Sequence, residues 1–333
     1  MKSFKKKLVF FLGILISIIC LYLVFNKTDI SNTLRTISKT NYLFLIPALT
    51  VFLLDFSLRA YRWRLLLAPV KRCNYLNLLS ATIIGFFANS VLPMRAGEVI
   101  RFVLASEKEK IPKTTVMATI VVERSLDIFS ILVLLSITFF VFPYPAQVKQ
   151  LWLMGLMVFF MLAIIFYGLM YHMEPTLKVL YAFIWILPKH LKNKIKHMLS
   201  LFVSGLQILK MTRSMFLIIP LSIIIWSLNV SMFYFIAKGM GIHQINYFGS
   251  IFILAGIALG ISVPSSPGYI GVYEYFGVLA CTILNVPKES ALSLILLTHS
   301  LQLLGIGITG SIALAREHLS MLQLGKKAEK EIQ

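Results

Sequence analysis

Apolar segments about as long as a membrane is thick recur along the whole chain and limit its fold more than any other feature. They fall at about 8–25, 43–58, 76–92, 115–142, 151–171, 214–237, 247–263, 269–286 and 290–315. A helix crosses the hydrocarbon core of a bilayer with about 20 apolar residues. Because hydrophobic residues make up 58% of the chain and charged residues only 14%, the sequence predicts an all-α polytopic integral membrane protein.

Two of the apolar regions contain an internal break that one membrane-spanning helix would not tolerate. Region 76–105 is broken at 92–97, and region 247–286 is broken at 263–274, in both cases by proline and glycine. Proline stops a helix, while glycine allows backbone conformations closed to other residues. Broken backbone at membrane depth survives only where protein buries it or where it lines a cavity. We therefore predict two re-entrant helical hairpins; for the second, a plain loop with Glu274 near the lipid headgroups is the alternative.

The charge distribution favours one topology. Lys and Arg number 32 against 13 Asp and Glu, which gives a formal net charge of +19. These positive residues lie between apolar segments, so we expect the anionic lipids of the inner leaflet as a partner and no nucleic acid. If the N-terminus is cytoplasmic and both broken regions return to the side they entered from, most Lys and Arg residues become cytoplasmic, as the positive-inside rule requires. The prediction is about six full spans plus two opposed hairpins in the plasma membrane, with both termini cytoplasmic.

The chain is predicted to hold one transmembrane domain. Opposed broken segments in two halves of a chain are typical of inverted-repeat transporters, and an inverted repeat is our structural conjecture here. Two short crossing helices in place of each hairpin would put the loops on the same sides of the membrane, with a count nearer ten spans. The domain covers 1–316, with pseudo-halves at about 43–171 and 214–316, a cytoplasmic connector at 174–213 and a short cytoplasmic tail at 317–333.

Two segments outside the apolar core carry their own predictions. After Pro188, apolar residues recur at helical spacing with lysines among them, which predicts an amphipathic helix resting on anionic lipid or packed on the protein itself. The basic segment 1–7 before the first apolar segment resembles a signal peptide, but no small-residue cleavage site follows. We expect an uncleaved first helix, and free thiols at the three cysteines.

Charged residues inside the apolar segments are the candidate functional groups, because such residues are costly in a membrane. Asp55 and Arg59 are four apart in the order that favours a helical pair. Arg62 and Trp63 follow, in a combination typical of an anchor at the lipid headgroups.

The first break leads into a short helix with Glu98 and Arg101. A helix that begins at mid-membrane would direct free N–H groups toward a phosphate, and Arg95 could hold the same phosphate with two parallel hydrogen bonds. An internal Glu98–Arg101 ion pair is the structural alternative.

A third cluster lies in the segment 115–142. Glu123 and Asp127 share a helix face, so both ionise cheaply only near a cation. Arg124, or an arginine of the first hairpin, could supply that cation. A purely structural buried network is the alternative to a transport pathway.

Four motifs follow one another in the chain: Arg59-x-x-Arg62-Trp63, Asn89…Leu92-Pro93-x-Arg95-x-Gly97-Glu98…Arg101, Glu123-Arg124…Asp127 and Val263-Pro264-Ser265-Ser266-Pro267-Gly268-x-x-Gly271-x-x-Glu274. With these motifs, nearly the whole chain resembles the flippase-like transmembrane domain of lysylphosphatidylglycerol synthases. That family includes the multiple peptide resistance factor of bacteria and stand-alone relatives. Its two-domain members add a cytoplasmic synthase domain, and this chain ends where that domain would begin.

The resemblance implies transport of a phosphate-bearing lipid between leaflets, without lipid-aminoacylating activity. The candidate lipids are an aminoacylated phospholipid such as lysyl-phosphatidylglycerol, another phospholipid, or a polyprenyl-phosphate lipid. No ATP-binding motif is recognisable, so a gradient would supply the energy or the movement would be passive. We expect no cofactor and no metal. The candidate protein partners are a separate lipid synthase and a second copy of the chain.

The predicted substrate-binding residues come from all four motifs: Arg59, Arg95, Glu98, Arg101, Glu123, Arg124, Asp127, Pro264, Ser265, Ser266, Pro267, Gly268, Gly271 and Glu274. The arginines would hold the phosphate, and the carboxylates would balance charge, contact an amine or carry protons. For Glu274 we predict an arginine partner from the first hairpin, Arg101 or Arg95.

Two rival functions stay open. One is an enzyme on lipid-linked substrates, with Glu123 and Asp127 as acid and base or as magnesium ligands; the other is a non-catalytic subunit of a lipid synthase.

Overall fold

The computed structural model describes residues 2–93, 95–141, 146–184 and 215–332, together with isolated residues between 188 and 203. These residues form helices and no strands, so the predicted all-α class is confirmed. In chain order the elements are α1 (Lys2–Phe25), α2 (Ile30–Ser38), η1 (Tyr42–Phe44), α3 (Leu45–Leu67), α4 (Tyr75–Val91), α5 (Ala96–Glu109), α6 (Lys113–Val141), α7 (Ala146–Tyr171), α8 (Met173–Ile184), α10 (Met215–Gly239), α11 (Tyr247–Gly260), η2 (Pro267–Tyr269), α12 (Val272–Ile283), α13 (Lys288–Arg316) and α14 (Met321–Ile332).

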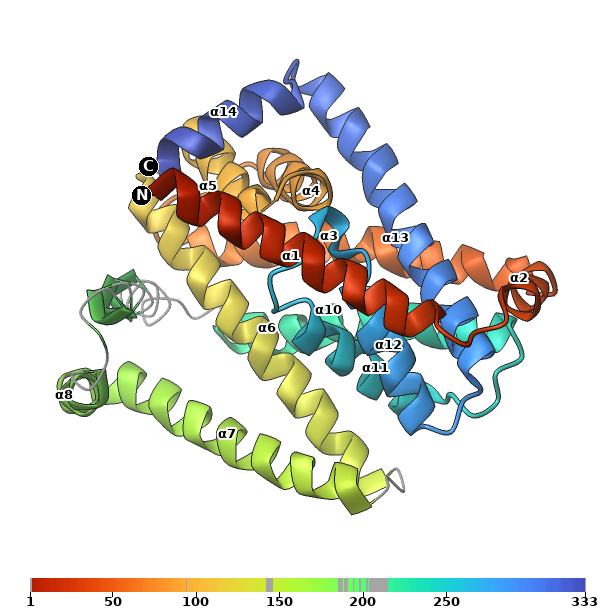
Figure 1. The fold of residues 1–333 in the computed structure, drawn as a ribbon. Helices are drawn as coiled ribbons and strands as arrows, with labels where there is room; N and C mark the ends of the chain where they lie inside the picture. The colour runs from red at the N-terminus through yellow and green to blue at the C-terminus, as the bar shows by residue number, and fades with distance from the viewer. Residues whose placement is uncertain are drawn as a thin grey trace.

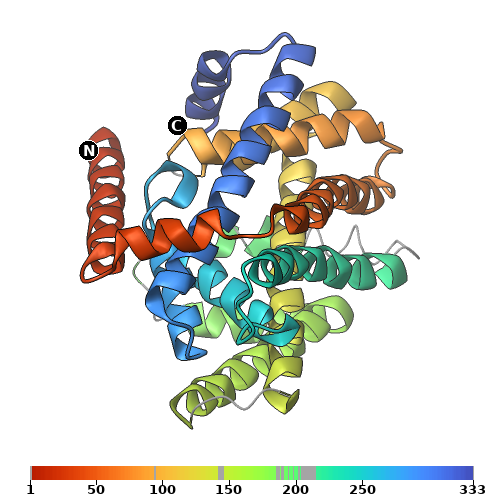
Figure 2. The same cartoon turned by 90° about the vertical axis from the view of Figure 1, so that its right-hand side faces the viewer.

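Several helices have the length and composition of membrane spans. Within the described residues, three segments qualify, Tyr42–Leu67, Phe216–Gly239 and Lys288–Arg316. A fourth span results if α1 and α2, which meet at an angle of 84°, are counted together; Figure 2 shows their bend. The chain is thus an integral membrane protein with several apolar helices, and the count of about six full spans stays a prediction.

Both predicted breaks are present. Helix α4 ends at Val91 and α5 begins at Ala96, while α11 ends at Gly260 and α12 begins at Val272. Gly268 and Gly271 have φ angles of +68° and +93°, which L side chains rarely adopt. Gly97 does not break the first region as predicted, because it lies inside α5; among the described residues of this break, the left-handed one is Arg95, with φ 54°. Whether the hairpins re-enter the membrane stays a prediction.

The two breaks lie against each other. Arg95 in the first break donates from Nη2 to the carbonyl of Ile261 at the start of the second, at 2.6 Å. In Figure 1, α4 and α5 lie above the loop of the second hairpin and α11 and α12 lie below it. Helix α1 covers this loop, where the Ser17 hydroxyl accepts from the Ser266 N–H at 2.9 Å. Protein thus packs against the second break, although Ser262, Val263 and Pro264 stay exposed; at membrane depth, broken backbone has to be buried by protein or line a cavity.

Buried apolar side chains gather in two main clusters. One is built chiefly by α3, α4, α5 and α6. The other is built chiefly by α10, α11, α12 and α13. The chain thus packs a core on each side of the meeting breaks, and the space between the cores is where polar groups collect.

The tail contains a helix of its own. Within 317–333, helix α14 packs on α5 through buried Leu324, and Lys327 pairs with Glu107 at 2.7 Å. Glu317 binds Lys108 and accepts from the Ser80 hydroxyl. Partial burial raises the pKa of Glu317, but these partners outweigh it, so the pKa lies below its ordinary value. The predicted amphipathic helix after Pro188 lies largely outside the described residues.

The topology can be tested with single cysteines at Asn193 in the connector and at Gln147 near the start of α7. We expect an impermeant thiol reagent to reach the two positions from opposite sides of the membrane. The native thiols give little background, because Cys20, Cys73 and Cys281 are free and buried. Burial also raises the pKa of the Cys73 thiol to about 11, which suppresses its reactive thiolate. Accessibility of both new cysteines from one side would contradict the two-hairpin topology.

Candidate functional site

A cavity of about 270 Å³ lies where the two broken hairpins meet. Its apolar wall comes mainly from α3, α4, α11 and α13, including Phe52, Phe56, Phe86, Leu254 and Ile306. Its polar wall contains Asp55, Arg59, Arg95, Glu98, Arg101, Arg124, Trp226, Asn229, Tyr269, Tyr273, His299 and Gln302. We call this the central cavity. Such a concave site with few convergent polar groups is typical of ligand binding.

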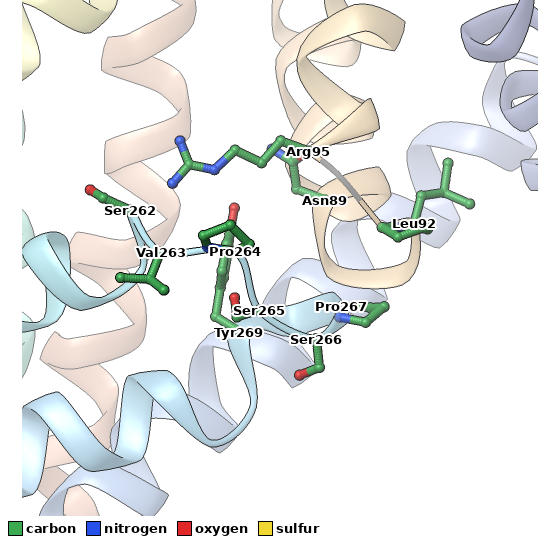
Figure 3. A pocket seen from close by; sticks show the side chains of 11 residues that line it. Asn89, Leu92, Arg95, Ser262, Val263, Pro264, Ser265, Ser266, Pro267 and Tyr269 are labelled. Atoms are coloured by element: carbon green, nitrogen blue, oxygen red, sulfur yellow. The ribbon is translucent and has the colours of Figure 1, made fainter. Parts of the chain in front are cut away.

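A second hollow of about 320 Å³ borders the second break itself. Figure 3 shows Ser262 to Pro267 along one side and Asn89, Leu92 and Arg95 on the other. The side chain of Arg95 extends between them toward Ser262. Asn89, Arg95 and Tyr269 line both the hollow and the central cavity. The guanidinium of Arg95 therefore stands at the junction of the two spaces.

The predicted Asp55–Arg59 pair on α3 is confirmed. Arg59 Nε lies 2.8 Å from Asp55 Oδ2, and Arg59 Nη1 lies 3.5 Å from Asp127 Oδ2 on α6. Asn229 on α10 donates to the other oxygen of Asp55 at 2.7 Å. The arginine also lies near the rings of Phe86 and Trp226. The Asp55–Arg59 pair thus links α3 to α6 and α10. It also forms a charged part of the cavity wall.

Arg62 and Trp63 do not form the predicted headgroup anchor. Both side chains are fully buried, because α3 packs between α6 and α10. Arg62 Nη2 lies 2.8 Å from Asp127 Oδ1, and Trp63 Nε1 donates to Thr119 Oγ1 at 3.1 Å. Arg62 is seven residues after Asp55 and shares its helix face, which was the sequence signal for a buried role.

Glu123 is the ion-pair partner of Arg101, which lies on α5 in the first hairpin. Arg101 donates to its two oxygens at 2.6 and 2.9 Å, and the guanidinium lies over the Trp63 ring at 4.0 Å from the centroid. Both charged residues are nearly or fully buried. The prediction that the first hairpin supplies a cation to this carboxylate is therefore confirmed.

Arg124 completes the network on α6. Its nitrogens lie 3.2 Å from Glu123, 3.3 Å from Asp127 and 3.7 Å from Glu98. The predicted reach of Arg124 to Asp127 is confirmed. The alternative of a Glu98–Arg101 pair is wrong, because Arg101 turns to α6 and Glu98 faces Arg124.

The charges of this network balance one another. The arginines are Arg59, Arg62, Arg101 and Arg124, and the carboxylates are Asp55, Glu98, Glu123 and Asp127. Arg95 stands apart: among the described residues it has no carboxylate partner, and its contact is the Ile261 carbonyl. With all these groups ionised, the ion-pair network is neutral, and exposed Arg95 adds one positive charge beside it.

The start of α5 does not offer the free N–H groups predicted for a phosphate. The N–H of Ala96 bonds to the Pro93 carbonyl and that of Glu98 to the Arg95 carbonyl. The N–H of Gly97 donates to Asn89 Oδ1 at 2.9 Å. This helix end is already capped by the chain itself, so an anion would have to bind the guanidinium of Arg95.

Glu274 is not paired with an arginine, contrary to the prediction. Its Oε1 lies 2.5 Å from Nδ1 of His299 on α13, and its Oε2 accepts from the Gly271 N–H at 2.6 Å. Both side chains are buried. The sequence reasoning missed His299, although a titratable residue within the apolar segment 290–315 was a visible signal.

Each predicted site residue either lines one of the two spaces or lies behind their walls. Arg59, Arg95, Glu98, Arg101, Arg124 and Gly268 line the central cavity, and Pro264, Ser265, Ser266 and Pro267 line the hollow. Glu123, Asp127, Gly271 and Glu274 line neither space. They lie behind the walls and hold the lining residues in place.

Comparison with known proteins identifies the relatives of the chain. The family described as lysylphosphatidylglycerol synthase TM region matches residues 10–310. UPF0104 membrane protein MJ1078 of Methanocaldococcus jannaschii is 25% identical over 230 residues, which are 68% of this chain and 92% of the relative. UPF0104 membrane protein MJ1595 of the same organism is 28% identical over 159 residues, and the match spans 46% of this chain and 47% of that protein. No solved structure matches the chain.

Proposed function

The chain belongs to the family of the lysylphosphatidylglycerol synthase TM region, and we propose that it moves a phosphate-bearing lipid between membrane leaflets. The headgroup would occupy the central cavity while the acyl chains stay in the bilayer. A cavity of about 270 Å³ has room for a headgroup but not for a whole lipid. Exposed Leu259, Val263 and Ile270 flank the second break, and they would face the acyl chains.

The observation that carries this proposal is the uncompensated charge of Arg95. The other arginines of the cavity have carboxylate partners, so the space attracts one further negative charge. A phosphodiester carries one negative charge, and arginine binds phosphate with two parallel hydrogen bonds. Binding would require Arg95 to exchange its contact with the Ile261 carbonyl for the phosphate. That exchange would separate the two breaks at the point where they touch.

The headgroup amine of an aminoacylated lipid would meet Glu98. This residue lines the central cavity, its side chain is 36% exposed, and its distance of 3.7 Å from Arg124 is the longest in the network. It is therefore the carboxylate most able to accept a second cation. Lysyl-phosphatidylglycerol, another phospholipid and a polyprenyl-phosphate lipid all carry the phosphate that Arg95 would bind, and only an amine-bearing headgroup would use Glu98.

The rival enzyme function has weaker support. Glu123 and Asp127 were its acid and base, but neither lines the central cavity. Both are held by arginines, which favours a structural and electrostatic role. A non-catalytic subunit of a lipid synthase would also bind lipid. It would not move lipid by itself, so transport by the protein alone distinguishes this alternative.

We predict that Arg95→Ala lowers lipid transport about tenfold or more, because a hydrogen bond to a charged group contributes about 1.5–3 kcal/mol. Arg95→Lys should also impair transport, since the ammonium keeps the charge but loses the planar fork. The measurement is leaflet-resolved labelling of candidate lipids in proteoliposomes that contain only this protein. Arg64→Ala is the matched control, as Arg64 is exposed on α3 and lines neither space. Full transport in both Arg95 variants at normal expression would remove this residue from the site.

A further inference from the structure

The ring of His299 lies between two hydrogen-bond acceptors. Nδ1 lies 2.5 Å from Glu274 Oε1, and Nε2 lies 3.0 Å from the carbonyl oxygen of Gly268. The ring also stacks on Tyr273, with 4.0 Å between centroids and 13° between planes. We propose that His299 and Glu274 form a proton-binding site whose occupancy holds the second break in place.

The number of protons follows from the chemistry of the partners. A backbone carbonyl only accepts, so Nε2 must carry a hydrogen. The contact between Nδ1 and the carboxylate requires a second proton, which belongs to the imidazolium or to the carboxylic acid. Either way, the pair holds one proton more than a neutral imidazole beside a carboxylate. This is the proton that the site binds and releases.

Loss of that proton leaves one ring hydrogen for two acceptors. The hydrogen bond to the carboxylate is charge-assisted and therefore stronger than the bond to a neutral carbonyl. The remaining hydrogen thus stays on Nδ1, and the bare lone pair of Nε2 faces the Gly268 oxygen. Nε2 and the Gly268 oxygen, 3.0 Å apart, are then two acceptors that repel each other. The second break thereby loses this hydrogen bond to α13.

The His299–Glu274 pair contacts the second break through two hydrogen bonds. His299 holds the carbonyl of Gly268, which lies within η2. Glu274 holds the N–H of Gly271, three residues further on. Gly268 and His299 both line the central cavity, so release of the break would change the shape of that cavity. The site thus links proton occupancy to the loop that Arg95 contacts.

Other ionisable groups act on the pair from the same cavity. They are Tyr273 beside it on α12, Tyr269 on η2, Asp55 and Arg59 on α3, Arg95 in the first break, Glu98 and Arg101 on α5, and Arg124 on α6. The lining residues of α10 and α11, and residues 11–25 of α1 against α12, contain no Asp, Glu, Lys, Arg or His. The nearest ionisable partner of His299 is therefore Glu274.

A spin label on the break tests this inference without any transported lipid. Ser265→Cys, with the three native cysteines replaced by alanine, would carry a nitroxide attached at one fixed pH. We expect the label in detergent-purified protein to be held at low pH and to gain mobility as the pH is raised, because the pair then loses its proton. His299→Gln should abolish this dependence, because an amide does not titrate.

A second variant keeps the test decisive if His299→Gln does not fold. In Glu274→Gln the amide oxygen can accept from the Gly271 N–H and the amide NH2 can donate to Nδ1. A neutral ring then keeps its hydrogen on Nε2 and its bond to Gly268, so the label should stay held at every pH. A label whose mobility does not depend on pH while His299 and Glu274 are both present, or a dependence that survives in both variants, would overturn the inference. Either result would leave the role of Arg95 in lipid transport untouched.

Discussion

Glu123→Gln is expected to destabilise the protein by about 3–5 kcal/mol, the usual cost of removing one partner from a buried ion pair. Glu123 is fully buried and holds Arg101 with two hydrogen bonds. It also lies 3.6 Å from Arg62 and 3.2 Å from Arg124. An amide has no charge to offset these guanidinium groups. The cost can be measured as the change in unfolding free energy in a denaturant titration of the detergent-purified protein.

The chain offers a matched control for this substitution at Glu107. Its ion pair with Lys327 is also short, at 2.7 Å, but 47% of the Glu107 side chain is exposed. Because exposed pairs contribute about 0–1 kcal/mol, Glu107→Gln should have little effect. Combining Glu123→Gln with Arg101→Met should cost less than the sum of the two single changes, since neither partner is then left alone. Equal effects of Glu123→Gln and Glu107→Gln would mean that the buried network does not stabilise the fold.

The sequence was sufficient to locate the breaks because local chemistry determines them. Proline and glycine act on their own backbone and on the preceding turn, so their positions predict where helices α4 and α11 end. The Asp55–Arg59 and Arg124–Asp127 pairs were predictable for the same reason, as spacing along one helix brings each pair together. The boundaries of α6, α10, α11, α12 and α13 follow the apolar segments closely, whereas α2, α5, α8 and α14 lie outside them.

The partners of Arg62 and Glu274 depended on tertiary packing instead. Arg62 was assigned to the headgroups because Trp63 follows it, yet α6 and α10 enclose both side chains. Glu274 was expected to meet an arginine, but its helix faces α13, where His299 is the available partner. Spacing within one segment indicates which residues share a face. It does not indicate which other helix covers that face, and this is why the proton-binding pair escaped the sequence reasoning.

Gly97→Ala is expected to prevent the α4–α5 hairpin from packing, with a loss of most folded protein. A Cβ atom at this position would lie 1.9 Å from the Gly85 carbonyl oxygen and 2.7 Å from the Asn89 backbone nitrogen. These are backbone atoms of α4, so the clash could be relieved only by moving one helix away from the other. That movement would displace Arg101 from Glu123 and break the hydrogen bond from the Gly97 N–H to Asn89. The steric cost would thus be added to the electrostatic one.

Gly307→Ala is the matched control for this change, because a Cβ atom there has no neighbour within 4 Å. In the middle of α13 it should leave stability unchanged or raise it by about 0.5–1 kcal/mol, the usual advantage of alanine over glycine in a helix. The measurement is the yield of monodisperse protein and its thermal midpoint in detergent. If Gly97→Ala matched Gly307→Ala in both, α4 and α5 would not be as close as the structure places them. The first break would then have room to move without an external trigger, and the contact between Arg95 and Ile261 would be one arrangement among several.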